Sequence, residues 1–157
     1  MSKNTFDIIK ANANRGNLDA ITVLGYCYYN GQGTKQNYKE AFRYYKKATY
    51  EGDLNAMYLL GNCYYEGHGT EINFNEAFLC YKKAANQGNI DAIYRVGYCY
   101  LKGHGTEINY NKSFLCLKEA AKKEAKQGYV SAILILGCCC IITFCNGVIS
   151  LLMIIDI

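Results

Sequence analysis

Apolar residues in the first part of the chain recur at the spacing of an α-helix. Over residues 18–30, four apolar side chains fall on one helix face: Ala20, Leu24, Cys27 and Tyr28. The stretch Gly31-Gln32-Gly33 then ends this helix, because glycine tolerates positive φ. A second helix follows Asn37, which with Glu40 forms an Asn-x-x-Glu version of the capping box. The pattern predicts a pair of helices, called helix A and helix B below, joined by a glycine-rich turn.

This helical pair is repeated along the chain. Residues 25–34 align with 61–70 and with 97–106, each copy 36 residues after the last. The same step relates further columns: Ala20, Ala56 and Ala92; Asn37, Asn73 and Asn109; Phe42, Phe78 and Phe114; Gly16, Gly52 and Gly88. A fixed period of this length is typical of a solenoid. We therefore expect an all-α fold, a right-handed α-α superhelix of about three helix-turn-helix repeats.

The columns also predict how the helices begin and how they pack. Each helix A is expected to start at an N-cap that follows a glycine: Asn17, Asp53 and Asn89. In the third copy Lys112 replaces the capping-box acid after Asn109, which predicts a looser start for that helix B. Glycines inside helix A are expected to face small residues of helix B, with Gly25 and Gly61 opposite Ala41 and Ala77. Two aromatic columns are expected to fill the space between layers: Tyr28, Tyr64 and Tyr100, and Phe42, Phe78 and Phe114.

Both ends of the chain depart from the full repeat. Residues 6–16 match residues 42–52, which predicts an opening half-repeat made of a lone helix B. Near the other end, four inserted residues, 122–125, shift the pattern by about one helical turn and extend the third helix B. A fourth helix A then begins and loses the motif. The predicted domains are a repeat region, 1–128, with repeats 17–52, 53–88 and 89–128, and a segment 129–157 that holds a degenerate fourth repeat and an apolar tail.

The repeated motif resembles that of a known family. It reads Ala20-x-x-x-Leu24-Gly25-x-x-Tyr28-x-x-Gly31-x-Gly33, followed by Ala41-x-x-Tyr44, Ala48 and Gly52. This spacing is similar to the Sel-1-like repeat, a relative of the tetratricopeptide repeat, over residues 6–128. The resemblance implies a non-catalytic adaptor or scaffold that holds partner proteins together, in signalling or in protein quality control at the endoplasmic reticulum. Disulfide-rich bacterial members place paired cysteines where this chain has Thr49 and Ala56, so that subclass is not expected.

Composition and charge change this picture little. The chain of 157 residues carries 17 Lys and Arg against 13 Asp and Glu, an excess too small for a dedicated nucleic-acid binder. Its N-terminus begins Met-Ser-Lys-Asn and has no apolar region of a secretory signal. We therefore expect a cytoplasmic protein whose nine cysteines are reduced, and a protein or peptide as its partner.

Helix A is expected to line the concave side of the stack, where side chains outside its buried stripe should face a partner. In the first repeat these side chains follow the spacing i, i+3, i+7, i+10 and i+11. The predicted partner-binding surface comprises Asp19, Thr22, Tyr26, Tyr29 and Asn30, then Asn55, Tyr58, Asn62, Tyr65 and Glu66, then Asp91, Tyr94, Tyr98, Leu101 and Lys102. Tyrosine supplies apolar area and the polar groups bond an extended backbone, which suits a peptide. For each single tyrosine, packing between the layers is an equally open alternative.

The sequence predicts no catalytic residue, cofactor or metal site. Cys27, Cys63 and Cys99 lie one repeat apart, and stacked helices are about 8–10 Å from one another, so these thiols cannot converge on one zinc ion. They are interpreted as core thiols. His68 and His104 have no acidic or thiol partner at ligand spacing and are expected to be exposed loop residues. The Gly-x-Gly turns lack the strand and the Gly-Lys-Ser/Thr sequence of a phosphate loop.

A basic ladder and an apolar tail leave alternatives open. Lysines recur on helix B, at Lys46-Lys47, Lys82-Lys83 and Lys118, where they face solvent or meet acidic partners or lipid headgroups. Residues 127–155 carry no charge, which predicts a membrane-spanning segment within 129–155 and hence a tail-anchored adaptor. The alternatives are a helix folded back over the solenoid, a tail that is not native sequence, and an inactive fragment of a larger repeat array.

Overall fold

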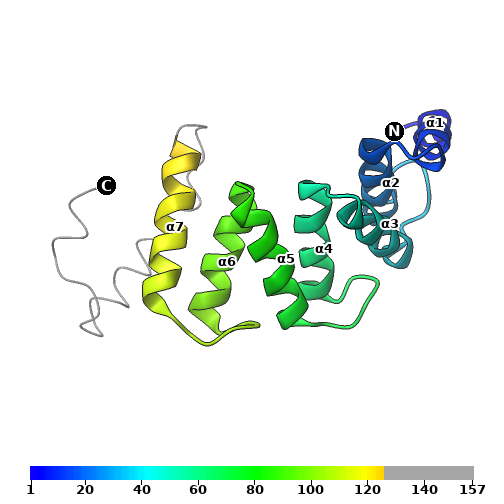
Figure 1. Cartoon of the computed structure of the whole chain (residues 1–157). Helices are drawn as coiled ribbons and strands as arrows, with labels where there is room; N and C mark the ends of the chain where they lie inside the picture. Colours follow the sequence, from blue (N-terminus) through cyan, green and yellow to red (C-terminus); the bar gives the residue numbers. More distant parts are fainter. Residues whose placement is uncertain (126–157) are drawn as a thin grey trace.

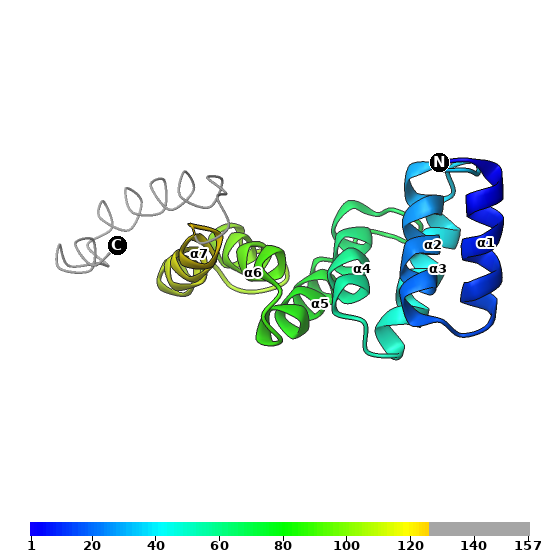
Figure 2. The same ribbon diagram turned by 90° about the horizontal axis from the view of Figure 1, so that it is seen from above.

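The helices form one continuous stack. The computed structural model describes residues 1–125, whose backbone contains seven α-helices and no β-strand. They are α1 (Lys3–Asn14), α2 (Leu18–Asn30), α3 (Tyr38–Tyr50), α4 (Leu54–Glu66), α5 (Phe74–Asn86), α6 (Ile90–Lys102) and α7 (Tyr110–Ala125). They follow one another in chain order along the long axis of the molecule (Figure 1), also when it is seen from above (Figure 2). Each packs mainly against its neighbours in the chain. The predicted all-α solenoid is confirmed.

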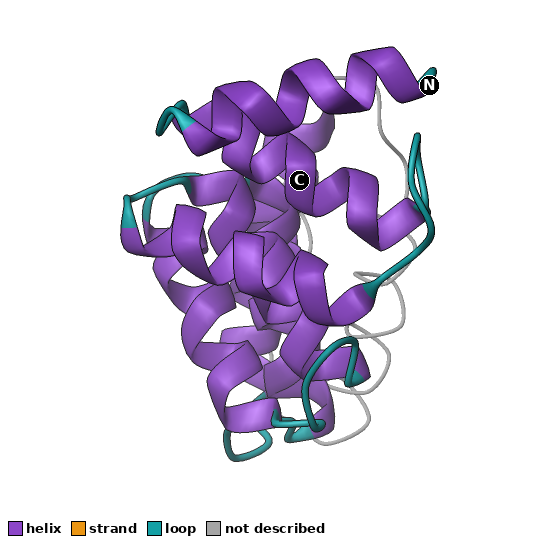
Figure 3. Ribbon diagram, turned by 90° about the vertical axis from the view of Figure 1, so that its right-hand side faces the viewer, coloured by secondary structure: helices purple, strands orange, loops and turns teal. Residues whose placement is uncertain are grey.

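Helix A begins and ends where the polar and glycine columns predict. The side chains of Asn17, Asp53 and Asn89 each accept a hydrogen bond of 2.8 Å from the backbone N–H three residues on. At the other end Gly31 adopts φ of +69°, in the left-handed region that favours glycine. The loops that follow connect the helices at the edges of the stack (Figure 3). The N-cap prediction is therefore confirmed in all three repeats.

Helix B begins differently from the capping-box prediction. The Asn37 side chain accepts from the backbone N–H of Glu40 at 3.1 Å, as expected. However, the backbone N–H of Asn37 donates to the carbonyl of Tyr28 at 2.8 Å, and the Glu40 carboxylate pairs with Arg43 at 2.6 Å. The reciprocal half of the box is therefore wrong, because the preceding helix A supplies the acceptor.

The third helix B starts like the others. The backbone N–H of Lys112 donates to the Asn109 side chain at 2.9 Å, and the backbone N–H of Asn109 donates to the carbonyl of Tyr100 at 2.9 Å. No copy uses an acid for this cap. The replacement of the acid by Lys112 therefore removes no cap hydrogen bond. The predicted looser start is wrong.

The glycines inside helix A face large side chains rather than alanines. A Cβ atom at Gly25 would lie 2.7 Å from Cε1 of Tyr45, and one at Gly61 would lie 2.6 Å from Cε1 of Tyr81. Both tyrosine side chains are fully buried. The glycines are needed because helix B presses an aromatic ring onto the helix A backbone, so the pairing with Ala41 and Ala77 is wrong.

Two aromatic columns join successive layers. The ring of Phe42 meets that of Tyr64 edge to face at a centroid distance of 5.3 Å, and Phe78 meets Tyr100 at the same distance. Phe6 of α1 makes the equivalent contact with Tyr28 at 5.5 Å. Each pair joins one helix B to the helix A that follows it, as the columns predict. Such pairs contribute about 0.5–1.5 kcal/mol beyond the area they bury.

The third helix B is longer than its predecessors. The last residue of α5 is Asn86, which corresponds to position 122, whereas α7 continues to Ala125. This agrees with the one-turn extension predicted from the inserted residues. The apolar tail, 129–157, lies outside the described residues. Within residues 1–125, no helix is both long and apolar enough to cross a membrane.

Candidate partner-binding surface

The predicted side chains lie on α2, α4 and α6, and together they define the helix-A surface. Two groups stand out among them. One group bonds to side chains of a neighbouring repeat and thereby helps to build the stack. The other group stays exposed: Asp19, Tyr26, Asn30, Asn55, Asp91 and Lys102.

Two hydrogen bonds made by the first group join the first and second repeats. The Thr22 hydroxyl donates to Oδ2 of Asp53 at 2.8 Å, while Oδ1 of the same carboxylate caps α4. The Tyr29 hydroxyl donates to Oε2 of Glu66 at 3.1 Å. Burial, followed by the charge of Glu66, raises the pKa of Tyr29 and keeps its hydroxyl protonated as a donor. Thr22 and Tyr29 are therefore less available to a partner than the sequence suggested.

The loop histidines are part of the same links. Nδ1 of His68 lies 2.8 Å from the Tyr29 hydroxyl, and its ring stacks on Tyr38 at a centroid distance of 4.2 Å. In the next repeat His104 lies 2.7 Å from the Tyr65 hydroxyl and stacks on Phe74 at 4.4 Å. Both histidines are half-buried. The prediction that they are exposed loop residues is wrong, because each loop folds against the aromatic residues of the preceding repeat.

Arg95 on α6 belongs to this surface, although the sequence analysis missed it. Its guanidinium lies 5.8 Å from the centroid of the Tyr65 ring, over its face. Burial lowers the pKa of Arg95, but the side chains of Tyr81 and Tyr58 outweigh this and hold the pKa above its usual value. The equivalent positions carry Val23 and Leu59, so the column looked apolar.

A hydrogen-bonded tyrosine lies beside this arginine. The Tyr81 hydroxyl donates to Oδ1 of Asn62 at 2.8 Å, and the Tyr81 ring lies 6.0 Å from that of Tyr58. Tyr98 is half-buried, with the ammonium group of Lys102 6.0 Å from its ring centroid. Tyr94 and Leu101 pack against the buried cluster of Phe114 and Leu117. The middle of the surface therefore combines the cations of Arg95 and Lys102 with several aromatic rings and hydroxyls.

The exposed group supplies the area that a partner would contact. Tyr26 exposes 46 % of its surface, whereas the other predicted tyrosines of helix A are half-buried. Asn30 donates from its amide to the carbonyl of Tyr26 at 3.1 Å. Tyr26 and Tyr98 occupy the same column of the repeat, with Asn62 between them.

The thiols are packed in the core. Cys27, Cys63 and Cys99 are buried and free, and burial raises the pKa of each, to about 12 for Cys63 and about 11 for Cys99. The interpretation as core thiols is confirmed. Within the part of the chain that the structure describes, no group of three or more His, Cys, Asp and Glu side chains could hold a metal ion.

Comparison with protein families now adds to this geometry. The model of the Sel1 repeat matches three times, over residues 18–53, 54–89 and 90–124. The chain belongs to the Sel1 repeat family. Comparison with curated proteins gives no match. The Sel1 matches agree with the helical pairs α2–α3, α4–α5 and α6–α7.

Solved structures show the same Sel1 architecture. A protective antigen of uropathogenic Escherichia coli strains, with an SLR fold, is 30% identical over 75% of this chain, with a TM-score of 0.72. A Sel1 repeat protein from Oxalobacter formigenes is 34% identical over 69% of the chain, with a TM-score of 0.65. Cysteine-rich protein B of Helicobacter pylori is similar in fold, at 21% identity over 87% of the chain and a TM-score of 0.64.

These proteins differ in length from the present chain. The chain spans 25% of the Escherichia coli structure, 44% of the Oxalobacter one and 98% of the Helicobacter one. Sel1 repeat proteins are in general protein-interaction modules, and the family is typically a non-enzymatic scaffold. Family membership therefore points to a protein partner and leaves its identity open.

Proposed function

We propose that this chain is a non-catalytic adaptor or scaffold that binds a peptide or a partner protein through its helix-A surface. The observation that supports this most is the exposed group on that surface. Cross-repeat bonds use Thr22, Tyr29 and Tyr65, whereas Tyr26 stays exposed. Arg95 and Tyr98 also contact the second repeat but remain half-exposed, so that part of each side chain can still meet a partner.

The chemistry of the helix-A surface suits an extended peptide. Tyr26 and Tyr98 offer rigid apolar area, which is a common source of binding energy in interfaces. Asp19, Asn55 and Asp91 recur at one position of helix A and can accept hydrogen bonds from backbone N–H groups. Arg95 offers a cation for a carboxylate of the partner. Neither a nucleic acid nor a cofactor is part of this proposal.

The experiment is a comparison of co-purified proteins from cells that produce the tagged full chain. In the test variant, Tyr26→Ala, Tyr98→Ala and Arg95→Leu are combined, and leucine at 95 repeats the residue that the chain has at Leu59. The control variant combines Lys39→Ala, Lys46→Ala and Lys47→Ala, three exposed residues of α3. Circular dichroism checks that both remain folded.

We expect the test variant to lose a specific partner that the wild-type chain and the lysine variant retain. Truncation of two central tyrosines and an arginine should weaken binding by about 2 kcal/mol or more, or at least about thirtyfold. A partner retained equally by all three proteins would contradict the proposal. Turnover of a substrate that disappears with the test variant would instead indicate an enzyme.

A tail-anchored adaptor is the second candidate, and the uncharged stretch of residues 127–155 favours it. Four lysines precede this stretch, Lys118, Lys122, Lys123 and Lys126, as on the cytosolic side of many anchors. In this case the repeats would face the cytoplasm. Resistance of the full chain, but not of residues 1–128, to carbonate extraction from membranes would support it. Equal extraction of both would remove it.

A further inference from the structure

A second feature of the molecule lies on the side away from the helix-A surface. A cavity of about 270 Å³ opens between α5, α6 and α7. We call it the α5–α7 crevice, and its lining includes Lys82, Ala85, Val96, Lys112, Leu115 and Cys116. Residues 93, 96 and 100 of α6 lie about half a turn from residues 91, 95 and 98. The crevice and the helix-A surface are therefore separate.

The repeat sequence explains why there is room here. Ala85 and Val96 stand where the preceding junction has the larger residues Thr49 and Leu60. The volume is below the roughly 300 Å³ at which small-molecule pockets commonly begin, so it fits a bulky side chain better than a cofactor. Burial raises the pKa of the Cys116 thiol, which therefore lines the crevice as a neutral apolar group.

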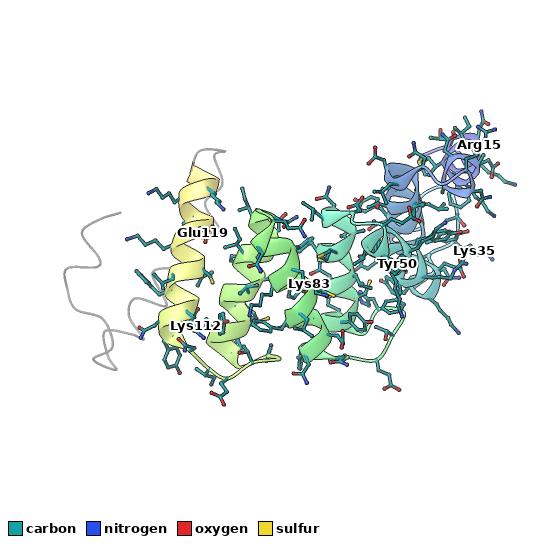
Figure 4. The ribbon with its side chains drawn as sticks, in the orientation of Figure 1. Arg15, Lys35, Tyr50, Lys83, Lys112 and Glu119 are labelled. Carbon is teal, nitrogen blue, oxygen red and sulfur yellow. The ribbon has the colours of Figure 1, made fainter. Side chains whose placement is uncertain are left out.

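The rim of the crevice is basic. The ammonium groups of Lys82 and Lys112 lie 6.0 Å from the ring centroid of Phe78 and 5.4 Å from that of Tyr100. Within residues 1–125 neither forms an ion pair. Glu119, the acid of the lining, pairs with Lys123 at 2.7 Å. Figure 4 labels Lys112 and Glu119 on α7 and Lys83 on α5. In the part of the chain that the structure describes, two cations therefore stand beside the crevice without an ion-pair partner.

Exposed leucines add to the apolar surface. Leu115, which lines the crevice, exposes 58 % of its surface, and Leu79, about one turn before Lys82 on α5, exposes 49 %. An apolar hollow lined by an exposed leucine, with lysines at its edge, is complementary to an amphipathic helix whose apolar side chain is flanked by carboxylates. The chain's own segment 127–155 carries no charge and cannot supply these carboxylates. Anionic lipids also carry negative charge, and the experiment below distinguishes them from a peptide.

We propose that the α5–α7 crevice is a second docking site, which takes a bulky apolar side chain from an acidic amphipathic segment of a partner protein. The site would give a role to Lys82, which belongs to the lysine ladder on helix B. The helix-A surface does not use this ladder. It is independent of the proposed function, because none of its lining residues belongs to the helix-A surface. The two surfaces would let one chain hold two partners.

The probe is a synthetic fluorescein-labelled helical peptide with two leucines one turn apart, each flanked by glutamates. Two matched peptides replace the glutamates by glutamines or the leucines by alanines. Binding to the full chain is followed by fluorescence anisotropy. The filling variant is A85T combined with V96L, which restores the residues of the preceding junction and should preserve the fold. The charge variant is K112E, which restores the acid found at Glu76. The control is R95L on the helix-A surface.

We expect the acidic leucine peptide to bind the wild-type chain. Each matched peptide should bind the wild-type chain at least about tenfold more weakly, and the acidic leucine peptide should bind the filling and charge variants at least about tenfold more weakly. R95L should leave it unchanged, so that failure here and failure of the helix-A proposal remain distinguishable. No binding, equal binding to all variants, or loss with R95L alone would overturn the site. Binding of phosphatidylserine vesicles that the filling variant abolishes, without peptide binding, would overturn it in favour of a lipid surface.

Discussion

The hydroxyl of Tyr29 lies 2.8 Å from Nδ1 of His68, a residue 39 positions further along the chain. The same pair recurs one repeat later between Tyr65 and His104, at 2.7 Å. Each loop histidine thus fastens the repeat that contains it to the helix A of the preceding repeat. These tyrosines, although spaced like binding residues, hold the stack together.

His68→Ala should lower the free energy of unfolding by about 1–2 kcal/mol, because it removes a ring stack and a half-buried hydrogen bond. The matched control is Gln32→Ala, at the equivalent loop position of the first repeat. Because this side chain is exposed, its removal should change the free energy of unfolding by no more than about 0.5 kcal/mol. Urea unfolding measures both. Equal losses in the two variants would contradict a fastening role for His68.

The start of helix B gives a second prediction. Asn73→Ala should cost about 1 kcal/mol, because it removes the side-chain acceptor for the backbone N–H of Glu76. Glu76→Ala should cost less than half as much, since the backbone N–H of Asn73 already donates to the carbonyl of Tyr64. Urea unfolding again gives the values. A larger loss of stability for Glu76→Ala than for Asn73→Ala would indicate that Glu76 does complete a capping box.

Gly61→Ala should destabilise the protein despite alanine's better helix propensity. The gain in propensity is about 1 kcal/mol, but the new Cβ would lie 2.6 Å from the ring of fully buried Tyr81, and overpacking costs about 1–3 kcal/mol. We expect a net loss of about 1 kcal/mol. Asn75→Ala, on the exposed face of α5, serves as control and should not destabilise. An increase in melting temperature for Gly61→Ala would disprove the close contact.

The buried thiols predict how stability depends on alkaline pH. The pKa values of Cys63 and Cys99 are raised from 9.0 to about 12 and about 11, so the unfolded chain releases their protons first. Their contribution to stability is full below about pH 9 and falls as the pH rises toward 11–12, by at most about 1.4 kcal/mol per pH unit for each thiol.

Urea unfolding between pH 8 and pH 10 measures this effect. The wild-type free energy of unfolding should change little up to pH 8 and fall from pH 9 to pH 10. The variant with Cys63→Ala and Cys99→Ala should be less stable throughout but fall less steeply. An equal slope for both proteins would mean that these thiols ionise as readily in the folded state.

Most of the fold could be predicted because its boundaries are local. Asn17, Asn37 and Gly31 fix helix ends through their own side chains or backbone freedom, and the 36-residue period repeats these signals. The wrong predictions all concern contacts between one helix or loop and another. Neither the carbonyl of Tyr28 as acceptor for Asn37 nor the ring of Tyr45 over Gly25 follows from spacing, because both depend on how one helix docks on the next.

The candidate site was harder to predict than the fold. Helical spacing identifies the side of helix A on which a side chain lies, but it does not distinguish exposed Tyr26 from Tyr29, which bonds to the next repeat. Arg95 was missed because Val23 and Leu59 made its column look apolar. His68 looked like an ordinary loop residue because its stacking partner, Tyr38, belongs to the preceding repeat.

The central claim is that the helix-A surface binds a protein partner. Site-specific photo-crosslinking tests it most directly, with a photoreactive phenylalanine placed at Tyr26 or Tyr98 on that surface, or at Tyr50, which exposes 93 % of its area at the end of α3. The account predicts that positions 26 and 98 crosslink the same protein in cells and that position 50 does not. Crosslinking of that protein from position 50 alone, or of none from positions 26 and 98, would contradict it.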